Sequence, residues 1–201
     1  MKNSLLLRSA LALALALATP LMASAESQLV TGAGNAAARL DFRVIVPRVL
    51  FLGVGTGAAA ATPANNTTID TVTFDYTANP AAVGTGAAAG TITGNVVPVR
   101  VIGNNGQITL AASTTGALTN ASADTIAWSE ITATSNQAAT LPSPVIPNTG
   151  AGAASNVSLS SGTKVTDRSA NWTFSYANSA VVAPGTYGTS NGRVTYTASM
   201  P

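Results

Sequence analysis

The sequence predicts an all-β protein built as an antiparallel sandwich or barrel, and three observations lead to that prediction. Short segments in which apolar and polar residues alternate recur along the chain, and a period of two is typical of half-buried strands. Loops rich in Gly, Pro, Asn and Ser separate these segments. No amphipathic helical pattern follows residue 25. About seven to nine short strands are therefore expected.

The composition excludes several classes of function. Of the 201 residues, 46% are hydrophobic, and only 8% are Asp, Glu, Lys or Arg, whereas about 25% is usual in soluble proteins. The chain contains no His and no Cys. This excludes metal sites built on those residues, thiol and His-based nucleophilic catalysis, and disulfides. The length predicts one domain, or at most one domain plus appendages.

Residues 1–25 have the features of a secretory signal peptide. Lys2 and Arg8 supply the positive charge, residues 10–18 form a short apolar run, and Ala23-Ser24-Ala25 fits the cleavage rule. The apolar run is shorter than the roughly 20 residues of a membrane span. We therefore expect an exported mature chain with no membrane span.

Removal of this leader changes the charge of the protein. Nine Lys and Arg residues less Lys2 and Arg8 leave seven, which equals the seven Asp and Glu residues. A net charge of zero leaves no basic stripe for nucleic acid. It also favours self-association.

The first strand signals lie in line on either side of Pro47. Residues 39–46 alternate, and Pro47 interrupts them because proline cannot donate a ladder hydrogen bond. Residues 48–54 follow as a nearly continuous apolar run, which is typical of a buried strand. One face of the first segment carries Leu40, Phe42, Val44 and Val46, and the other carries Arg39, Asp41, Arg43 and Ile45.

Further strands are expected later in the chain. The sequence Gly103-Asn-Asn-Gly106 predicts a hairpin turn between two of them. A Pro-rich piece, residues 141–147, is expected to be extended and to lie on a sheet edge. The expected strands cover residues 69–77, 96–102, 107–112, 125–133, 170–177 and 192–200.

Two patterns are weighed as chemistry and set aside. Ser161-Gly-Thr-Lys164 matches S-x-x-K, but that Ser/Lys pair requires a helix, and this tetrapeptide lies in a Gly-containing turn. Trp128 and Trp172 are candidates for a sugar-stacking platform, but each lies within an alternating segment, so core packing is expected. We therefore expect no enzyme activity, no cofactor and no metal.

The two ends of the domain carry a family resemblance. Residues 183–187 (Ala-Pro-Gly-Thr-Tyr) lead into an alternating last strand at 193–199, which resembles the C-terminus of bacterial chaperone–usher pilins. The in-line pair at 40–47 and 48–52 resembles the disulfide-free pilin subunits, in which an N-terminal extension precedes the first domain strand. The resemblance covers residues 38–54 and 183–201.

The resemblance implies a fold and an assembly mechanism. Such fimbrial major subunits are Ig-like β-sandwiches that lack one strand and carry an N-terminal strand extension. A periplasmic chaperone first fills the resulting groove. At the outer-membrane usher, the extension of the next subunit then takes its place, which builds a fibre on the cell surface. Applied here, this implies a signal peptide at 1–25, an extension at 26–47 and an Ig-like domain at 48–201.

The resemblance also assigns a role to the extension. Residues 39–46 become the donor strand, and its alternating apolar side chains fill pockets in a neighbouring copy. These predicted subunit contacts are Leu40, Phe42, Val44 and Val46.

Two other hypotheses stay open at this point. In the first, the chain is a monomeric secreted Ig-like or jelly-roll module that binds a glycan or a surface protein. Residues 39–46 then pair within their own domain. In the second, the chain is an enzyme that uses Ser161 and Lys164.

Overall fold

The computed structural model describes residues 27–59 and 62–201, so the predicted signal peptide and Glu26 lie outside the described residues. The chain divides into two compact units, residues 1–46 and residues 47–201. In the first unit, residues 27–46 form no strand and their side chains are exposed. Among these described residues, the Ala37 amide donates a hydrogen bond to Gln28 Oε1 at 3.0 Å.

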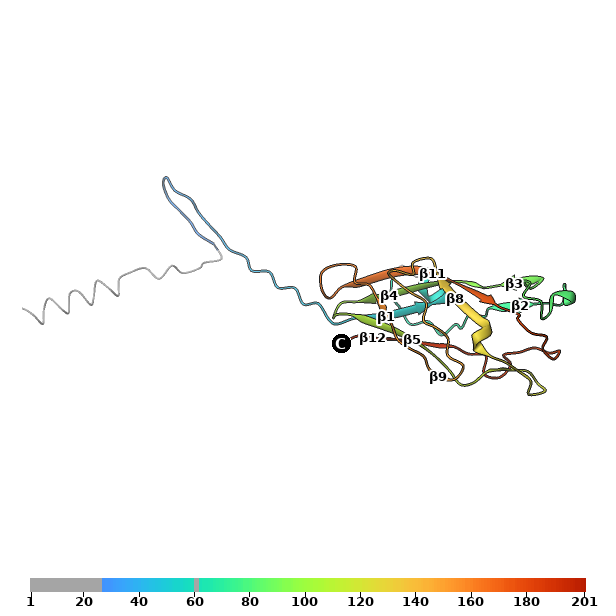
Figure 1. Cartoon of the computed structure of the whole chain (residues 1–201). Helices are drawn as coiled ribbons and strands as arrows, with labels where there is room; N and C mark the ends of the chain where they lie inside the picture. Colours follow the sequence, from blue (N-terminus) through green and yellow to red (C-terminus); the bar gives the residue numbers. More distant parts are fainter. Residues whose placement is uncertain (1–26, 60–61) are drawn as a thin grey trace, which may run out of the picture. The chain divides into compact units, whose positions relative to one another are not determined.

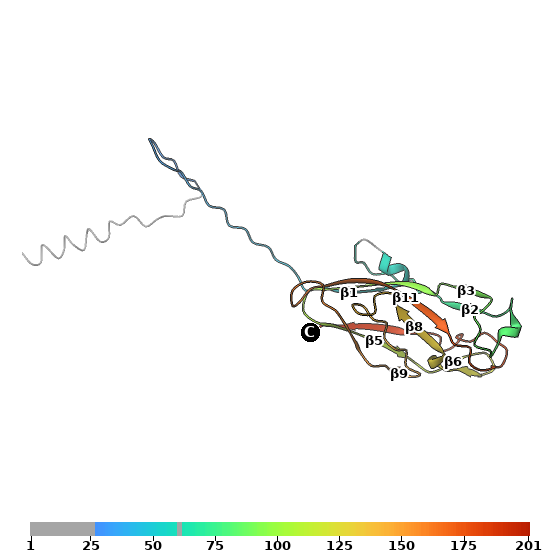
Figure 2. The ribbon, with the colours of Figure 1, turned by 45° about the horizontal axis from the view of Figure 1, so that its top comes forward.

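The second unit is an all-β sandwich of antiparallel sheets, which confirms the predicted fold class (Figures 1 and 2). The first sheet has the order β1-β4-β11-β8, with β1 (Leu50–Val54), β4 (Val96–Gly103), β11 (Thr166–Tyr176) and β8 (Ile131–Ser135). The second has the order β10-β5-β12, with β10 (Ser155–Val157), β5 (Ile108–Thr114) and β12 (Thr195–Ser199), and β9 (Gly150–Ala151) also pairs with β5.

Shorter elements lie outside these two sheets. Two-stranded pairs are formed by β2 (Thr73–Asp75) with β3 (Thr91–Thr93), and by β6 (Leu118–Thr119) with β7 (Thr125–Ile126). Single 3₁₀ turns are η1 (Gly55–Ala59), η2 (Pro80–Ala82) and η3 (Trp128–Glu130). Among the described residues, no helix is both long and apolar enough to cross a membrane.

The core lies between the inner faces of the central strands. Alternate residues of β4 and β5 point inward and are fully or almost fully buried, as the period of two requires. Trp172 of β11 is completely buried, and its ring lies 5.0 Å from the ring of Tyr196 on β12. The inward rows are Val97, Val99 and Val101 on β4, and Ile108, Leu110 and Ala112 on β5.

The turn at residues 103–106 is not a hairpin, and this part of the prediction is wrong. The strands on either side of it are present, but β4 belongs to the first sheet and β5 to the second. Hairpin pairing would place their two buried rows side by side on one sheet. The rows instead face each other across the core. Gly103 permits this corner, because a Cβ there would lie 2.6 Å from Ile108 Cδ1.

The segment predicted as one strand at 125–133 is interrupted. It forms β7, then η3, then the start of β8. Trp128 lies in η3, where its indole Nε1 donates a hydrogen bond of 2.7 Å to the Gly116 carbonyl. Trp128 and Trp172 are both buried, so they pack in the core, as expected, and do not form an exposed sugar platform. The strand expected at 69–77 is reduced to β2.

The Pro-rich piece closes one side of the sandwich and is not an exposed edge. Leu141 and Pro144 are fully buried and Ile146 nearly so, because apolar side chains at this side complete the core. Ser135 at the end of β8 donates its hydroxyl hydrogen bond to the Leu141 carbonyl at 2.7 Å. The Ser158 amide, just after β10, donates to the Thr140 carbonyl at 2.9 Å. The chain therefore joins the two sheets along the side formed by β8 and β10.

Candidate functional site

The opposite side of the sandwich is formed by two edge strands, β1 and β12. Among the described residues, β1 pairs with β4 alone and β12 pairs with β5 alone. Leu50 is paired with Gly103 and Ser199 with Thr109, so β1 starts and β12 ends at the same corner of the molecule. Each strand presents one row of backbone groups that its own sheet does not use. This side can therefore accept another strand.

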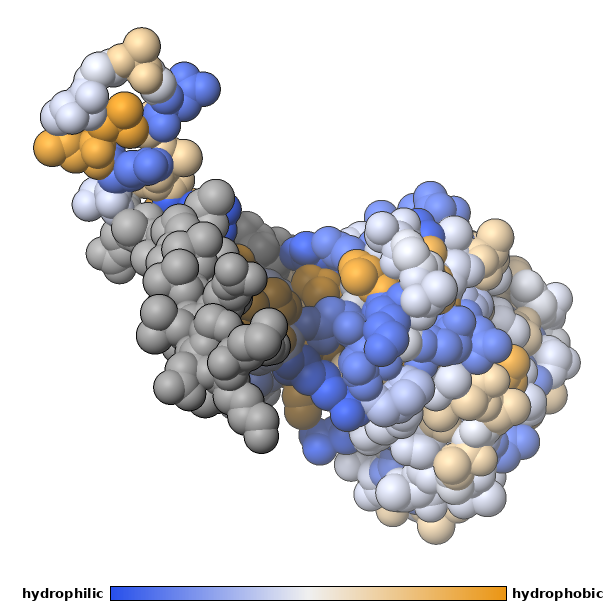
Figure 3. All heavy atoms as spheres, turned by 90° about the vertical axis from the view of Figure 1, so that its left-hand side faces the viewer, coloured by the Kyte–Doolittle hydropathy of each residue, from blue (hydrophilic) through white to orange (hydrophobic). Residues whose placement is uncertain are grey.

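Side-chain hydrogen bonds hold the corner end of this opening. Asn104 accepts from the Val49 amide at 2.8 Å and donates to the Pro47 carbonyl at 2.7 Å. The Arg48 guanidinium donates to the Met200 carbonyl at 3.1 Å. The start of the first strand and the end of the last are thus attached to each other and to the corner. Where it is visible in Figure 3, this end of the sandwich carries mostly polar residues, with small separate hydrophobic areas.

The inward side chains of β1 and β12 are only half-buried, in contrast to those of β4 and β5. They pack on the same core, but their outer sides remain accessible. The side of the core that lies between β1 and β12 is therefore partly open to solvent. The residues concerned are Leu52 and Val54 on β1, and Val194, Tyr196, Ala198 and Met200 on or beside β12.

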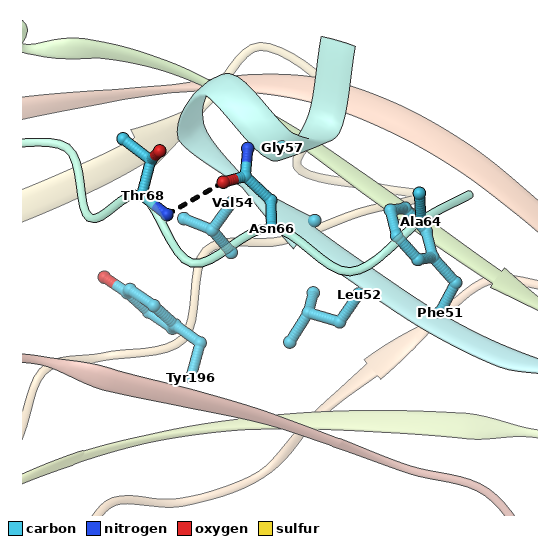
Figure 4. Close-up of a pocket in the computed structure, with 9 residues that line it drawn as sticks. Phe51, Leu52, Val54, Gly57, Ala64, Asn66, Thr68 and Tyr196 are labelled. Carbon is cyan, nitrogen blue, oxygen red and sulfur yellow. Dashed lines mark hydrogen bonds between the residues drawn. The ribbon is translucent and has the colours of Figure 1, made fainter. Parts of the chain in front are cut away.

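A cavity of about 230 Å³ opens at this place, and we call it the groove (Figure 4). Side chains of β1 and the ring of Tyr196 form the apolar part of its lining, and Asn66 and Thr68 make the opposite wall polar. Among the described lining residues, Tyr196 carries the only ionisable group. The Tyr196 hydroxyl is buried without a hydrogen-bond partner, and burial raises its pKa above the usual value. The groove is lined by Phe51, Leu52, Gly53, Val54, Gly57, Ala64, Asn66, Thr68 and Tyr196.

A groove that runs between two open strand edges and has an apolar row along β1 and β12 suits one kind of ligand. Backbone groups on both sides can hydrogen-bond to an extended peptide, and the half-buried row can receive alternate apolar side chains. In the described part of the chain, no three side chains of the His, Cys, Asp or Glu type come together in a group that could hold a metal ion.

The S-x-x-K tetrapeptide lies in a tight turn outside the groove. Ser161 and Val165 exchange backbone hydrogen bonds of 3.3 Å across the turn, and Gly162 has a φ of +55°. The Lys164 carbonyl accepts from the Gly106 amide at 3.1 Å. Ser161 and Lys164 are therefore not one helical turn apart on a common helix face, which the Ser/Lys chemistry requires.

The predicted donor side chains are exposed and belong to no strand. Their exposed fractions lie between 73% and 86%. Comparison of this chain with protein-family models, curated proteins and solved structures finds no match. Function is therefore argued from the groove and the extension. These four exposed residues are Leu40, Phe42, Val44 and Val46.

The resemblance implies a groove, but sequence analysis did not identify the residues that line it. Leu52, Val54 and Tyr196 lie in segments predicted as strands, and their alternation is visible in the sequence. Alternation identifies an inward face but not a strand's neighbours, so it does not distinguish an edge strand from a central one.

Proposed function

We propose that this chain is a structural subunit of a bacterial surface fibre, assembled by donor-strand exchange on an Ig-like sandwich that lacks one strand. Residues 39–46 of one copy fill the groove of the next. The observation that carries the proposal is that one chain combines two complementary features. It has an open, apolar sandwich side between β1 and β12, and it has an exposed segment with alternating apolar residues.

The chemistry of the two parts is complementary. Burying each of the four apolar side chains contributes about 1.5–3 kcal/mol. An inserted strand also gives hydrogen-bond partners to the open edges of β1 and β12. Arg39, Asp41 and Arg43 lie on the other face of the alternating segment and remain in solvent.

The connection to Pro47 favours a second copy as the acceptor. β12 runs toward the corner, so a strand antiparallel to it ends at the far end of the groove. In its own domain, Val46 is bonded directly to Pro47, and Asn104 holds the Pro47 carbonyl at the corner. The parallel alternative within one chain requires a reversal between Val46 and Leu50, where residues 47–49 contain no turn.

This polarity predicts a fibre. The last residue of the donor strand leaves the acceptor subunit at the end that lies away from the acceptor's corner. The donor's own domain begins there, with its own corner first. Each contact joins different surfaces of two identical subunits, and such head-to-tail contacts build an open fibre when the rotation between neighbouring subunits does not close a ring. We propose that the chain is exported and passes through the periplasm. There a chaperone covers the open edges until an outer-membrane usher delivers the subunit to the surface. No catalytic step and no cofactor form part of the proposal.

A synthetic peptide of residues 39–46 tests the proposal directly. The mature chain carrying Phe42→Asp serves as the acceptor, so that copies do not fill one another's grooves. The peptide is expected to raise the unfolding free energy of this chain by about 2.7 kcal/mol at a concentration 100 times its Kd. Thermal unfolding at several peptide concentrations measures the effect.

The matched control is the same peptide with Val44→Asp, which places a charge on the inward face. It is expected to leave the melting temperature unchanged. If the unmodified peptide has no effect either, and the chain stays monomeric on a sizing column, then the monomeric binding module accounts better for the chain.

A further inference from the structure

The chain itself passes along the groove a second time. After η1, residues 62–69 run beside β1, and three alternate residues of this segment line the groove opposite Tyr196 (Figure 4). These residues are Ala64, Asn66 and Thr68. Their spacing of two is that of a strand laid into the opening.

This segment nevertheless lacks the bonds of a strand. Within the described chain, residues 62–69 make no backbone hydrogen bond to β1 or β12, and their side chains are exposed. The Thr68 amide is bonded only locally, to Asn66 Oδ1 at 2.8 Å. The segment also leaves the Tyr196 hydroxyl buried without a partner.

The other side of the sandwich shows how this protein builds a permanent closure. There, the chain inserts the fully buried Leu141 and is fixed to both sheets by the hydrogen bonds of Ser135 and Ser158. Residues 62–69 have neither feature. The comparison indicates that they lie along the groove and cover part of it without completing the sandwich.

Two contacts attach the segment close to η1. The Asp70 carboxylate accepts from the Thr56 amide at 2.5 Å and from the Thr56 hydroxyl at 2.8 Å. Gly55, with a φ of +78°, makes room for this carboxylate, since a Cβ there would clash with it. The Asn66 Cβ lies 3.3 Å from the position of a Cβ built on Gly57. These contacts hold the segment to η1 beside the groove. The segment does not pair with the edges of β1 and β12.

We propose that residues 62–69 are a provisional cover along the groove in the unassembled subunit, and that the donor strand of a second copy displaces them. This inference rests on the proposed function and adds a step that regulates it, because the groove accepts a donor strand only after residues 62–69 have left. The segment shields the open edges from unwanted strand pairing. A donor strand replaces it because the donor supplies backbone hydrogen bonds and larger apolar side chains.

A reversible engineered disulfide tests whether residues 62–69 must leave the groove. The chain has no native Cys, so no other disulfide can form within it. A disulfide requires Cβ atoms about 3.5–4.5 Å apart. The separation at Gly57 and Asn66 is close to that range, so Gly57→Cys with Asn66→Cys would hold the segment in place when oxidised. The pair is introduced into the mature Phe42→Asp chain, and binding of a fluorescent peptide of residues 39–46 is followed by anisotropy. The two single Cys variants, treated with the same oxidant, are the matched controls.

The oxidised double variant is expected to bind the peptide about tenfold more weakly or worse, because apparent affinity falls with the fraction of molecules whose groove is open. Reduction is expected to restore the affinity of the parent chain, which also shows that the variant folds. In addition, Asp70→Ala removes the contact with Thr56 and is expected to speed peptide association.

Other outcomes separate the two proposals. Equal binding by the oxidised and reduced forms would overturn the displacement of residues 62–69 and leave donor-strand exchange in place. No peptide binding by any form, the parent chain included, would overturn the proposed function and this inference with it.

Discussion

Val44→Asp is expected to abolish assembly of the chain, whereas Ile45→Asp is expected to leave it intact. The two residues are neighbours with similar exposure in the extension, 83% and 76%. In a strand, they point to opposite faces, so only Val44 enters the groove. The Val44 substitution loses the burial of one apolar side chain and forces a carboxylate toward the core. The penalty is about 3 kcal/mol or more, or about a hundredfold in the exchange equilibrium.

The measurement is an SDS gel of material sheared from the cell surface, run unheated beside heated. Strand-complemented fibres unfold slowly, so wild type and Ile45→Asp are expected to give a ladder that collapses on heating. Val44→Asp is expected to give only the monomer band in both lanes while export continues. Equal ladders from both variants would contradict the donor assignment. They would show that residues 39–46 have no inward face, as expected of a linker that forms no strand.

Trp172→Ala is expected to cause the largest loss of stability from a single substitution in the domain. Trp172 is completely buried on β11, and its ring contacts that of Tyr196 on β12, so it links the two sheets beneath the groove. Truncating a buried Trp to Ala costs about 3–5 kcal/mol. This is a large share of the stability of about 5–15 kcal/mol that is usual for a domain.

Urea unfolding, followed through the fluorescence of Trp128, measures this loss. Val181→Ala is the control, since Val181 is 78% exposed and is expected to change stability by about 0.5 kcal/mol or less. Because Trp172 supports the ring of Tyr196, Trp172→Ala is also expected to weaken binding of the 39–46 peptide. A loss similar to that of the control would show that the two sheets are not joined at Trp172.

The strands with clear alternation were predictable because alternation reports directly on burial. β4, β5, β11 and β12 all lie within or overlap the segments expected from sequence. The corner at residues 103–106 was not predictable, since a Gly-Asn-Asn-Gly turn has the same composition in a hairpin and between two sheets. The burial of Leu141 and Ile146 was missed because their Pro-rich surroundings suggested an edge.

The candidate site, too, has one part that could be predicted from the sequence and one part that could not. The apolar face of residues 39–46 is a local pattern and can be identified from the sequence alone. The groove depends on which strands lack a neighbour, and that is set by contacts between residues far apart in the chain. Leu52 and Tyr196 are separated by more than a hundred positions, yet they line the same opening. The passage of residues 62–69 along that opening has no sequence signal, because the segment is polar and lacks strand alternation.

Amide hydrogen exchange of residues 39–46 tests the central claim most directly. It compares assembled wild-type chains with the unassembled Phe42→Asp chain. In the unassembled chain these amides are expected to exchange rapidly, since the segment forms no strand there. In the assembly, strong protection of this segment is expected, together with new protection along β12. Assembled chains in which residues 39–46 still exchange as fast as in the monomer would contradict donor-strand exchange.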